Sequence, residues 1–283
     1  MTQLPAGACD AHCHVIGPHA RYPLAPGAGD IRSDSCADHL RLLDNLGLAR
    51  AVIVHPSSVY GDAHDALLDA LAQGGERYRG VAVAHEDVSD ATLERWRDAG
   101  VRALRFVTVK DAQGRSFAGS ASFDDFLALA PRLKALGWHA QFWGDCADII
   151  RRERDFTSAG VPIVLDHMGK IDVGAGPMGR DFLRLCELVR DGAFWVKLTL
   201  CRNSHLGPDY TDLRPFHDAL IAANPDRLLW GSDWPHLRMG AAAPDPAHLL
   251  DLFQSWIKDP EIEAKILAAN PQSLFGFAPN GGK

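Results

Sequence analysis

The feature that most constrains the fold is the recurrence of short β-rich runs, each followed by a stretch of helical periodicity. Several of these runs, such as "RAVIVHP" and "VPIVLDH", are almost entirely apolar. Such strands are typical of a parallel sheet that is buried on both faces. The sequence predicts eight strands, at residues 9–16, 51–55, 80–84, 101–107, 138–143, 161–167, 194–200 and 227–233.

The segments between the strands carry signals for the starts and ends of helices. "CADHLRLLDNLG" ends at Gly47, a predicted C-cap, and "DAHDALLDALAQGG" offers Asp62 as a possible N-cap. "SDATLERWRDAG" and "SFDDFLALAPRLKALG" each begin at a serine and stop at a glycine, and Pro131 is a point where the second helix could bend or break. After the last strand, "DPAHLLDLFQSWIKD" and "PEIEAKILAANPQSLFGF" predict closing helices.

Eight strands alternating with helices in 283 residues predict a single (β/α)₈ TIM barrel over residues 1–283. In such a barrel the active site lies at the C-terminal ends of the strands. A doubly wound sheet is the alternative, but it usually carries a Gly-rich phosphate loop after an early strand. No G-x-G-x-x-G follows an early predicted strand, the chain has no Walker A motif, and no linker or repeat divides it. We therefore expect one domain.

Composition and charge exclude several classes of partner. The net charge of −7 and the absence of Lys/Arg runs argue against nucleic acid. No run approaches the ~20 apolar residues of a membrane span. The segment "MTQLPAGACD" lacks the features of a signal peptide, so we expect a cytoplasmic protein. The six cysteines form no Cys-x-x-Cys pair and are expected to be reduced. Whether the chain forms a homo-oligomer is left open.

The stretch "ACDAHCHVI" places two histidines two residues apart, near the start of the chain and within the first predicted strand. Residues i and i+2 of a strand face the same way, so His12 and His14 should project side by side. Cys13 should point the opposite way, into the barrel wall, and is not expected to bind a metal. Two imidazoles this close call for a shared partner.

Polar side chains gather where the predicted strands end, whereas the strand bodies are apolar. They are His12, His14, His55, Arg105, Gln141, Trp143, His167, Arg202 and Asp233. His12, His14, His167 and Asp233 have the ligand types for one Zn²⁺ or Mn²⁺ ion, with a further position left for water. The alternative is a hydrogen-bonded cluster without metal, in which Asp233 acts as a general base and a histidine polarises a carbonyl.

Three motifs carry a resemblance to a known family. "DAHCHV" near the N-terminus, "VLDHMGK" in the sixth predicted strand and "LLWGSDWPH" in the eighth resemble the amidohydrolase superfamily. The resemblance is to its branch of 2-pyrone-4,6-dicarboxylate lactonases and related sugar-lactone and muconolactone hydrolases. It runs nearly end to end and includes "YPLAP", "GVRALRF" and "NPQSLFGF".

The resemblance implies that His12, His14, His167 and Asp233 are the catalytic set and the candidate metal ligands. Some members of this branch use a divalent metal and some work without one. Gln141 stands where other amidohydrolases have a metal-binding histidine, and the fourth strand offers Arg105 in place of a carboxylated lysine. Both departures favour a mononuclear or a metal-free site.

For the substrate, the resemblance implies carboxylate anchors around the mouth. Arg105 matches one such arginine, Lys170 stands where the branch tends to have arginine, and Trp143 replaces a tyrosine. Because lysine lacks the planar fork of arginine, bidentate carboxylate recognition would be lost there. The expected anion anchors are Arg105, Lys170 and Arg202. Further candidates for the wall of the site are His55, Ser57, Tyr60, Trp143 and His236.

The resulting hypothesis is a hydrolase that opens the lactone ring of a small carboxylated or sulfonated lactone. Asp233 would take a proton from the attacking water. The alternatives are a metal-dependent decarboxylase of an aromatic or enol acid, a metal-independent lactone isomerase, and a binding protein on a degenerate barrel. The intact His/His/His/Asp set disfavours the last of these.

Overall fold

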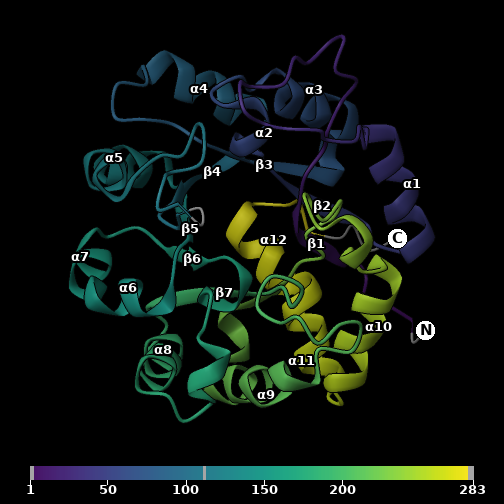
Figure 1. Cartoon of the computed structure of the whole chain (residues 1–283), viewed down its shortest axis with the longest axis vertical. Coiled ribbons are helices and arrows are strands. Elements are labelled where there is room, and N and C mark those ends of the chain that lie inside the picture. Colours follow the sequence, from purple (N-terminus) through teal and green to yellow (C-terminus); the bar gives the residue numbers. More distant parts are fainter. Residues whose placement is uncertain (1–2, 111–112, 280–283) are drawn as a thin grey trace.

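A computed structural model describes residues 3–110 and 113–279. Eight parallel strands form one sheet in chain order, β1 to β8, and helices surround it (Figure 1). The predicted (β/α)₈ barrel is confirmed. The strands are β1 Cys9–Cys13, β2 Arg50–Val54, β3 Tyr78–Ala82, β4 Val101–Val107, β5 His139–Trp143, β6 Ile163–Leu165, β7 Phe194–Leu198 and β8 Leu228–Trp230.

Strands β6 and β8 are shorter than predicted, because their polar C-terminal residues leave the ladder. His167 begins a 3₁₀ turn with a φ of 50°, directly after Asp166. Asp233 has a φ of 64°, three residues beyond the end of β8. Both segments therefore turn into the mouth of the barrel. Strand β3 begins two residues before the predicted start.

The helices largely follow the predicted signals. Ser122 caps α5 Phe123–Leu136, and Gly47 ends α1 Cys36–Leu46 with a φ of 73°. Helix α3 begins at Asp65 and not near Asp62. Helix α5 continues through Pro131, which is exposed, so water can replace the lost hydrogen bond. The other helices are α2 Ser57–Tyr60, α4 Asp90–Asp98, α6 Cys146–Arg151, α7 Glu153–Ser158, α8 Arg180–Arg190, α9 Arg214–Ala223, α10 Pro246–Trp256, α11 Pro260–Ala264 and α12 Asn270–Phe275.

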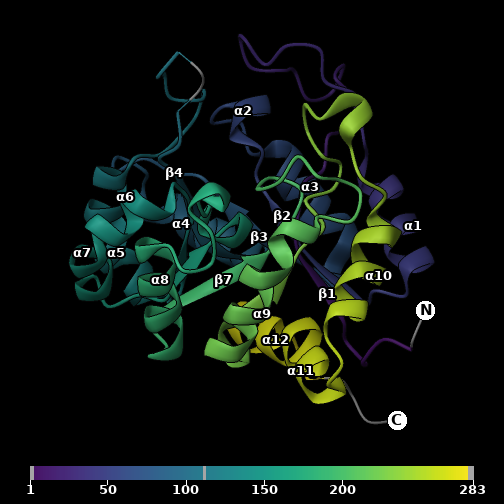
Figure 2. The ribbon, with the colours of Figure 1, turned by 60° about the horizontal axis from the view of Figure 1, so that its bottom comes forward.

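The interior of the barrel is apolar in its lower half. Small and branched side chains from several strands pack there with Phe275 and Phe277 of the C-terminal segment. Helix α12 lies at the end opposite to the long loops, which gather with α2 on the other side (Figure 2). This packing leaves the upper half for polar groups. In the described residues no helix is long and apolar enough to cross a membrane.

A β-bulge in β1 directs its functional side chains. Asp10 pairs with Ala51 and Cys13 with Ile53, so two residues of β1 lie opposite the single residue between them in β2. A bulge of this kind turns a side chain out of the ordinary alternation. Ala11 packs in the lower barrel interior, and its neighbour His12 also contacts the inward-facing Lys197. Cys13 remains on the outer side.

The barrel is closed where β1 meets the segment after β8. The amide of Asp233 donates to the carbonyl of His12 at 2.8 Å, and the amide of His14 donates to the carbonyl of Trp234 at 2.7 Å. Gly231 lies at this seam, and a Cβ added to it would lie 2.6 Å from Cβ of His12. The close approach of the two segments therefore requires glycine at position 231.

Candidate active site

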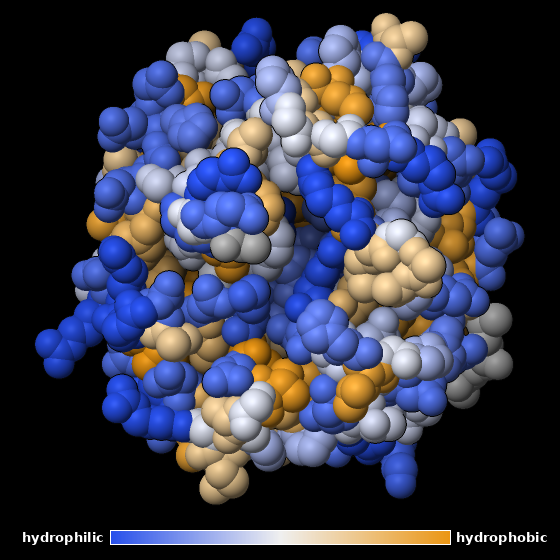
Figure 3. All heavy atoms as spheres, in the orientation of Figure 1, coloured by the Kyte–Doolittle hydropathy of each residue, from blue (hydrophilic) through white to orange (hydrophobic). Residues whose placement is uncertain are grey.

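A cavity of about 230 Å³ opens at the C-terminal ends of the strands. Its lining comes from the ends of several strands and the loops that follow them. Figure 3 looks onto this face of the molecule and shows a hollow near its centre, bordered by hydrophilic side chains. Of the residues predicted from sequence, the cavity is lined by His14, Ser57, Arg105, Trp143, His167, Arg202 and Asp233.

Asp233 lies at the floor of the cavity, close to His12 of β1 and to His14 just after this strand. Its Oδ1 lies 3.6 Å from Nε2 of His12 and 3.5 Å from Nε2 of His14. Nδ1 of His14 lies 2.8 Å from the carbonyl oxygen of Val54, which can only accept, so this nitrogen carries the proton. In the neutral ring, the lone pair on Nε2 then faces a carboxylate oxygen. A cation or a proton between them would stabilise this arrangement.

His167 completes the set predicted from sequence. Its ring centre lies 4.7 Å from that of His12, and its buried Nδ1 has no hydrogen-bond partner in the part of the chain that the structure describes. Burial lowers the pKa of His167 to about 3. Burial likewise holds the pKa of His12 well below its ordinary value. Both rings are therefore neutral near pH 7, the state in which imidazole binds metals.

The donor set fits one divalent ion. Ligand atoms of His12, His14 and Asp233 lie within 4.8 Å of one another, and all three side chains are buried. Nε2 of His12 has no hydrogen-bond partner among the described residues. Two imidazoles and one carboxylate are ligands that suit Zn²⁺ or Mn²⁺.

Arg202 binds the other oxygen of Asp233. Its Nε lies 2.5 Å from Oδ2, and its Nη1 donates to the carbonyl of Leu237 at 3.0 Å. Burial alone would raise the pKa of Asp233, but the charge of Arg202 and the neighbouring His14, His167 and His12 side chains together hold the pKa well below its usual range. Asp233 is thus ionised at neutral pH, with Oδ1 facing the histidines.

A buried ionic network lies behind this floor, and sequence reasoning missed most of it. Asp166 accepts a hydrogen bond from Nε of Arg105 at 2.8 Å, and its other oxygen lies 3.1 Å from Nζ of Lys197. Lys197, which is fully buried in β7, also donates to Oε1 of Gln141 at 2.6 Å and lies 3.1 Å from Nδ1 of His12. Burial would raise the pKa of Asp166, but Lys197, His12 and Arg105 hold it well below the usual value.

A signal for this network was present in the sequence. Lys197 interrupts the otherwise apolar strand "FWVKL", and a lysine is almost never fully buried without a partner. Asp166 stands in the motif "VLDHMGK" directly before His167. Its facing direction could not be read from the motif, because the strand ends there.

Four residues expected at the wall lie elsewhere. Lys170 forms an ion pair with Asp145 at 2.5 Å and lines a neighbouring cavity, because its φ of 45° turns it away after the 3₁₀ turn. The other three bind loop backbone, behind the wall. Nε2 of His55 lies 2.7 Å from the carbonyl of Gly61, the hydroxyl of Tyr60 accepts from the amide of Gly17, and Nε2 of His236 lies 3.1 Å from the carbonyl of Ser232.

The structure also adds residues that the sequence did not single out. Phe117 and Ser120 come from the loop after β4, Ser58 from α2, and Leu237 and Arg238 from the loop after β8. Phe117 stacks on Trp143 with ring centres 5.5 Å apart, and the Arg105 guanidinium lies 5.2 Å from the centre of the Trp143 ring. The aromatic pair thus gives the cavity a flat apolar wall beside a cation.

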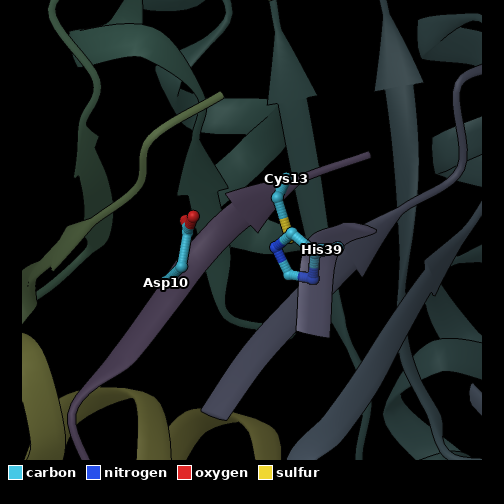
Figure 4. A group of neighbouring side chains, drawn as sticks. All are labelled: Asp10, Cys13 and His39. Atoms are coloured by element: carbon cyan, nitrogen blue, oxygen red, sulfur yellow. The ribbon is translucent and has the colours of Figure 1, made fainter. Parts of the chain in front are cut away.

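A second group of potential ligands, Asp10, Cys13 and His39, lies on the outer side of β1 (Figure 4). Asp10 already accepts from the Ser232 hydroxyl at 2.5 Å and from the amides of Ser232 and His12 at 3.0 Å. Burial raises the pKa of Asp10 to about 6. This carboxylate therefore links β1, next to His12, to the segment that follows β8.

A family model described as amidohydrolase matches residues 9–277. This chain belongs to the amidohydrolase family. The resemblance predicted from the three motifs is thereby confirmed, and the chain is an amidohydrolase whose His/His/His/Asp set lies at the barrel mouth.

Relatives of this amidohydrolase act on lactones. It is 34% identical to a 2-pyrone-4,6-dicarboxylate hydrolase of Comamonas testosteroni, with 96% of this chain and 91% of the relative covered. It is also 34% identical to a 4-sulfomuconolactone hydrolase of Rhizobium radiobacter, with the same coverage. A solved amidohydrolase of Burkholderia multivorans with bound zinc superposes with a TM-score of 0.75. At 21% identity, covering 96% of this chain and 100% of that one, it shows the shared fold alone.

Proposed function

We propose that this amidohydrolase hydrolyses the ring ester of a small carboxylated lactone. The candidate substrates resemble 2-pyrone-4,6-dicarboxylate, a muconolactone or a sugar-acid lactone. The observation that carries the proposal is the ionised Asp233, buried against His12 and His14 at the floor of a cavity with arginines in its wall. The lactone substrates named for two relatives support the same chemistry.

In the proposed reaction Asp233 is the general base. Its Oδ1 accepts a proton from a water molecule as the water oxygen bonds to the lactone carbonyl carbon, which gives a tetrahedral oxyanion. The carbon–oxygen bond of the ring then breaks, and the proton held by Asp233 passes to the departing ring oxygen. The product is an open-chain hydroxy or enol acid, and the carboxyl group formed loses its proton to solvent.

We further propose that one Zn²⁺ or Mn²⁺ ion is held by His12, His14 and Asp233, with His167 as a fourth candidate ligand. When bound, the ion would polarise the lactone carbonyl and lower the pKa of a water molecule. Whether or not an ion is present, Asp233 supplies the base, and the neutral imidazoles line the place where the carbonyl must lie.

The wall residues supply recognition of the anion in this proposal. Arg105 lies in the cavity wall with its Nε held by Asp166, so its remaining donors are pre-oriented. Trp143 and Phe117 offer a flat surface against which an unsaturated or sugar-like ring can pack. The substrate class is therefore a compact ring that bears at least one carboxylate.

The proposal is tested by incubating the enzyme with a panel of carboxylated lactones and their methyl esters, with pH-stat titration and mass spectrometry as readouts. Hydrolysis adds one water to the mass and releases acid. Isomerisation leaves the mass unchanged, and decarboxylation loses carbon dioxide. A panel in which wild type produces either of the latter two, or in which it prefers the ester, contradicts the proposal.

A further inference from the structure

Three arginines line the cavity, and they differ in how their charge is balanced. Arg105 is paired with Asp166, and Arg202 with Asp233. Arg238 has no carboxylate partner in residues 3–110 and 113–279; its guanidinium donates to neutral oxygens of the loops around it. Nη1 donates to the hydroxyl of Ser58 at 2.9 Å, and Nη2 donates to the carbonyls of Ser58 at 2.9 Å and Ala28 at 3.1 Å.

These contacts fix the Arg238 side chain without neutralising it. They use three of its five N–H donors, so two remain for another acceptor. The Ser58 hydroxyl accepts from Arg238, so its own proton can be donated to a ligand oxygen. Both side chains line the cavity. A held, unpaired guanidinium next to a free hydroxyl proton is the kind of site that binds a carboxylate or a sulfonate.

The charge balance of the cavity also favours two anionic groups. Among the lining residues that the structure describes, three are arginines and the only carboxylate is Asp233, which leaves an excess of two positive charges, histidines aside. Behind the wall, Asp166 and Lys197 offset each other. Arg105 is buried, Arg202 is half-buried and Arg238 is exposed, so the excess positive charge is available to attract an anion that enters the cavity.

The backbone of the loop after β8 is shaped to present Arg238. Arg238 has a φ of 63°, in a region that L-residues other than asparagine, aspartate and histidine rarely adopt, and Asp233 and His236 before it have φ values of 64° and 59°. Such strained conformations persist only where the surroundings over-determine them, and they gather at functional sites. Here Arg202 holds the neighbouring carbonyl of Leu237 at 3.0 Å.

We infer that Arg238, together with Ser58, binds the second anionic group of a dianionic substrate. Arg105 binds the first anionic group. Arg238 gives the site its preference for substrates that carry a second one. This assignment rests on the proposed function for the identity of the ring. The recognition of two anionic groups is independent of the proposed function, because it can be measured with an inert ligand.

The test compares two inert aromatic probes by isothermal titration calorimetry: isophthalate, with two carboxylates, and benzoate, with one. Wild type is expected to bind isophthalate at least tenfold more tightly. Arg238→Gln should weaken isophthalate about 10- to 100-fold and benzoate less than threefold, because one charge-assisted contact is lost. The control Arg32→Gln removes an exposed charge that pairs with Asp34 and does not line this cavity, and it should preserve the preference.

Two further variants separate recognition from loop structure. Arg238→Lys keeps the charge without the fork and should restore part of the preference. Ser58→Ala should reduce it about three- to tenfold even if Arg238→Gln does not fold. The inference is overturned if wild type binds the two probes equally or binds neither, or if Arg238→Gln weakens both alike. If the enzyme opens no lactone, the proposed function is wrong. The calorimetry would still test the two-anion site independently.

Discussion

Nζ of Lys197 lies 3.1 Å from Nδ1 of His12, so a fully buried lysine contacts the histidine that faces Asp233. The same nitrogen lies 3.1 Å from Oδ1 of Asp166 and 2.6 Å from Oε1 of Gln141. Burial lowers the pKa of Lys197, and the charge of Asp166 opposes that shift. Lys197 is therefore a positioning residue that contacts His12 of β1, Gln141 of β5 and Asp166, which follows β6.

Lys197→Met should destabilise the protein by ~3–5 kcal/mol, because it leaves the carboxylate of Asp166 buried with one fewer cation. The free energy of unfolding in urea measures this. The control is Lys265→Met, whose exposed lysine pairs with Asp226 at 2.8 Å and should contribute little to stability. Equal losses in the two variants would show that the buried network adds no stability.

Asp233→Asn should keep the fold but lower turnover by at least ~10²-fold, because an amide cannot accept the proton from water. Turnover of the preferred lactone and the circular dichroism spectrum are the measurements. Asp226→Asn removes a carboxylate of the same kind from an exposed turn and serves as the control. Near-normal turnover in Asp233→Asn would exclude the general-base role.

Elemental analysis of the purified protein should find about one Zn²⁺ or Mn²⁺ ion per chain, and chelation should lower the melting temperature. His14→Gln should lose the ion, whereas His19→Gln, at an exposed position, should retain it. If metal-free protein keeps both its melting temperature and full activity, the neutral histidines and Asp233 act without an ion.

Gly231→Ala should disturb the seam between β1 and β8, since its Cβ would lie 2.6 Å from Cβ and 3.0 Å from the backbone nitrogen of His12. Overpacking of this kind costs ~1–3 kcal/mol, and displacement of His12 should reduce turnover as well. Gly207→Ala is the comparison, because its added Cβ meets Tyr210 only at 3.4 Å. Unchanged turnover and stability in Gly231→Ala would mean that the seam can relax.

The protein should lose stability as the pH falls below about 6.5. His217 is buried against Trp256, and burial lowers its pKa from 6.5 to about 4. Between these values the unfolded chain binds a proton that the folded state does not, so the free energy of unfolding falls by up to ~1.4 kcal/mol per pH unit for this group.

His217→Leu should remove that part of the pH dependence and leave the protein's stability less sensitive between pH 6.5 and 4. Urea denaturation at a series of pH values compares the two slopes. Identical slopes in wild type and variant would show that His217 does not contribute.

The order of the strands and the positions of the mouth residues were predictable, because a parallel barrel brings every strand end to one face. Asp233, His12 and His14 follow from that rule alone. The network around Lys197 was not predictable, since it depends on which inward-facing residues of β5, β6 and β7 lie at the same height along the barrel axis. That register arises from the pairing of β6 with β5 and β7, which hydrophobic periodicity does not specify.

Lys170 and Arg238 lie where the sequence did not place them, and each difference has a local cause. Lys170 was expected as an anion anchor at the mouth of the barrel, but the 3₁₀ turn after β6 and its own φ of 45° carry it to Asp145. Arg238 escaped notice because it stands five residues past Asp233, and only the winding of that loop returns it to the cavity. Neither conformation has a signature in hydrophobic periodicity.

The seam between His12 and Asp233 has a consequence for synthesis of the protein. The two halves of the site are separated by about 220 residues, and they meet only when the last strand docks against the first. A nascent chain on the ribosome can hold His12 and His14 long before it holds their partner. Catalysis therefore begins after the eighth strand has emerged, and a chain cut before Asp233 should be inert.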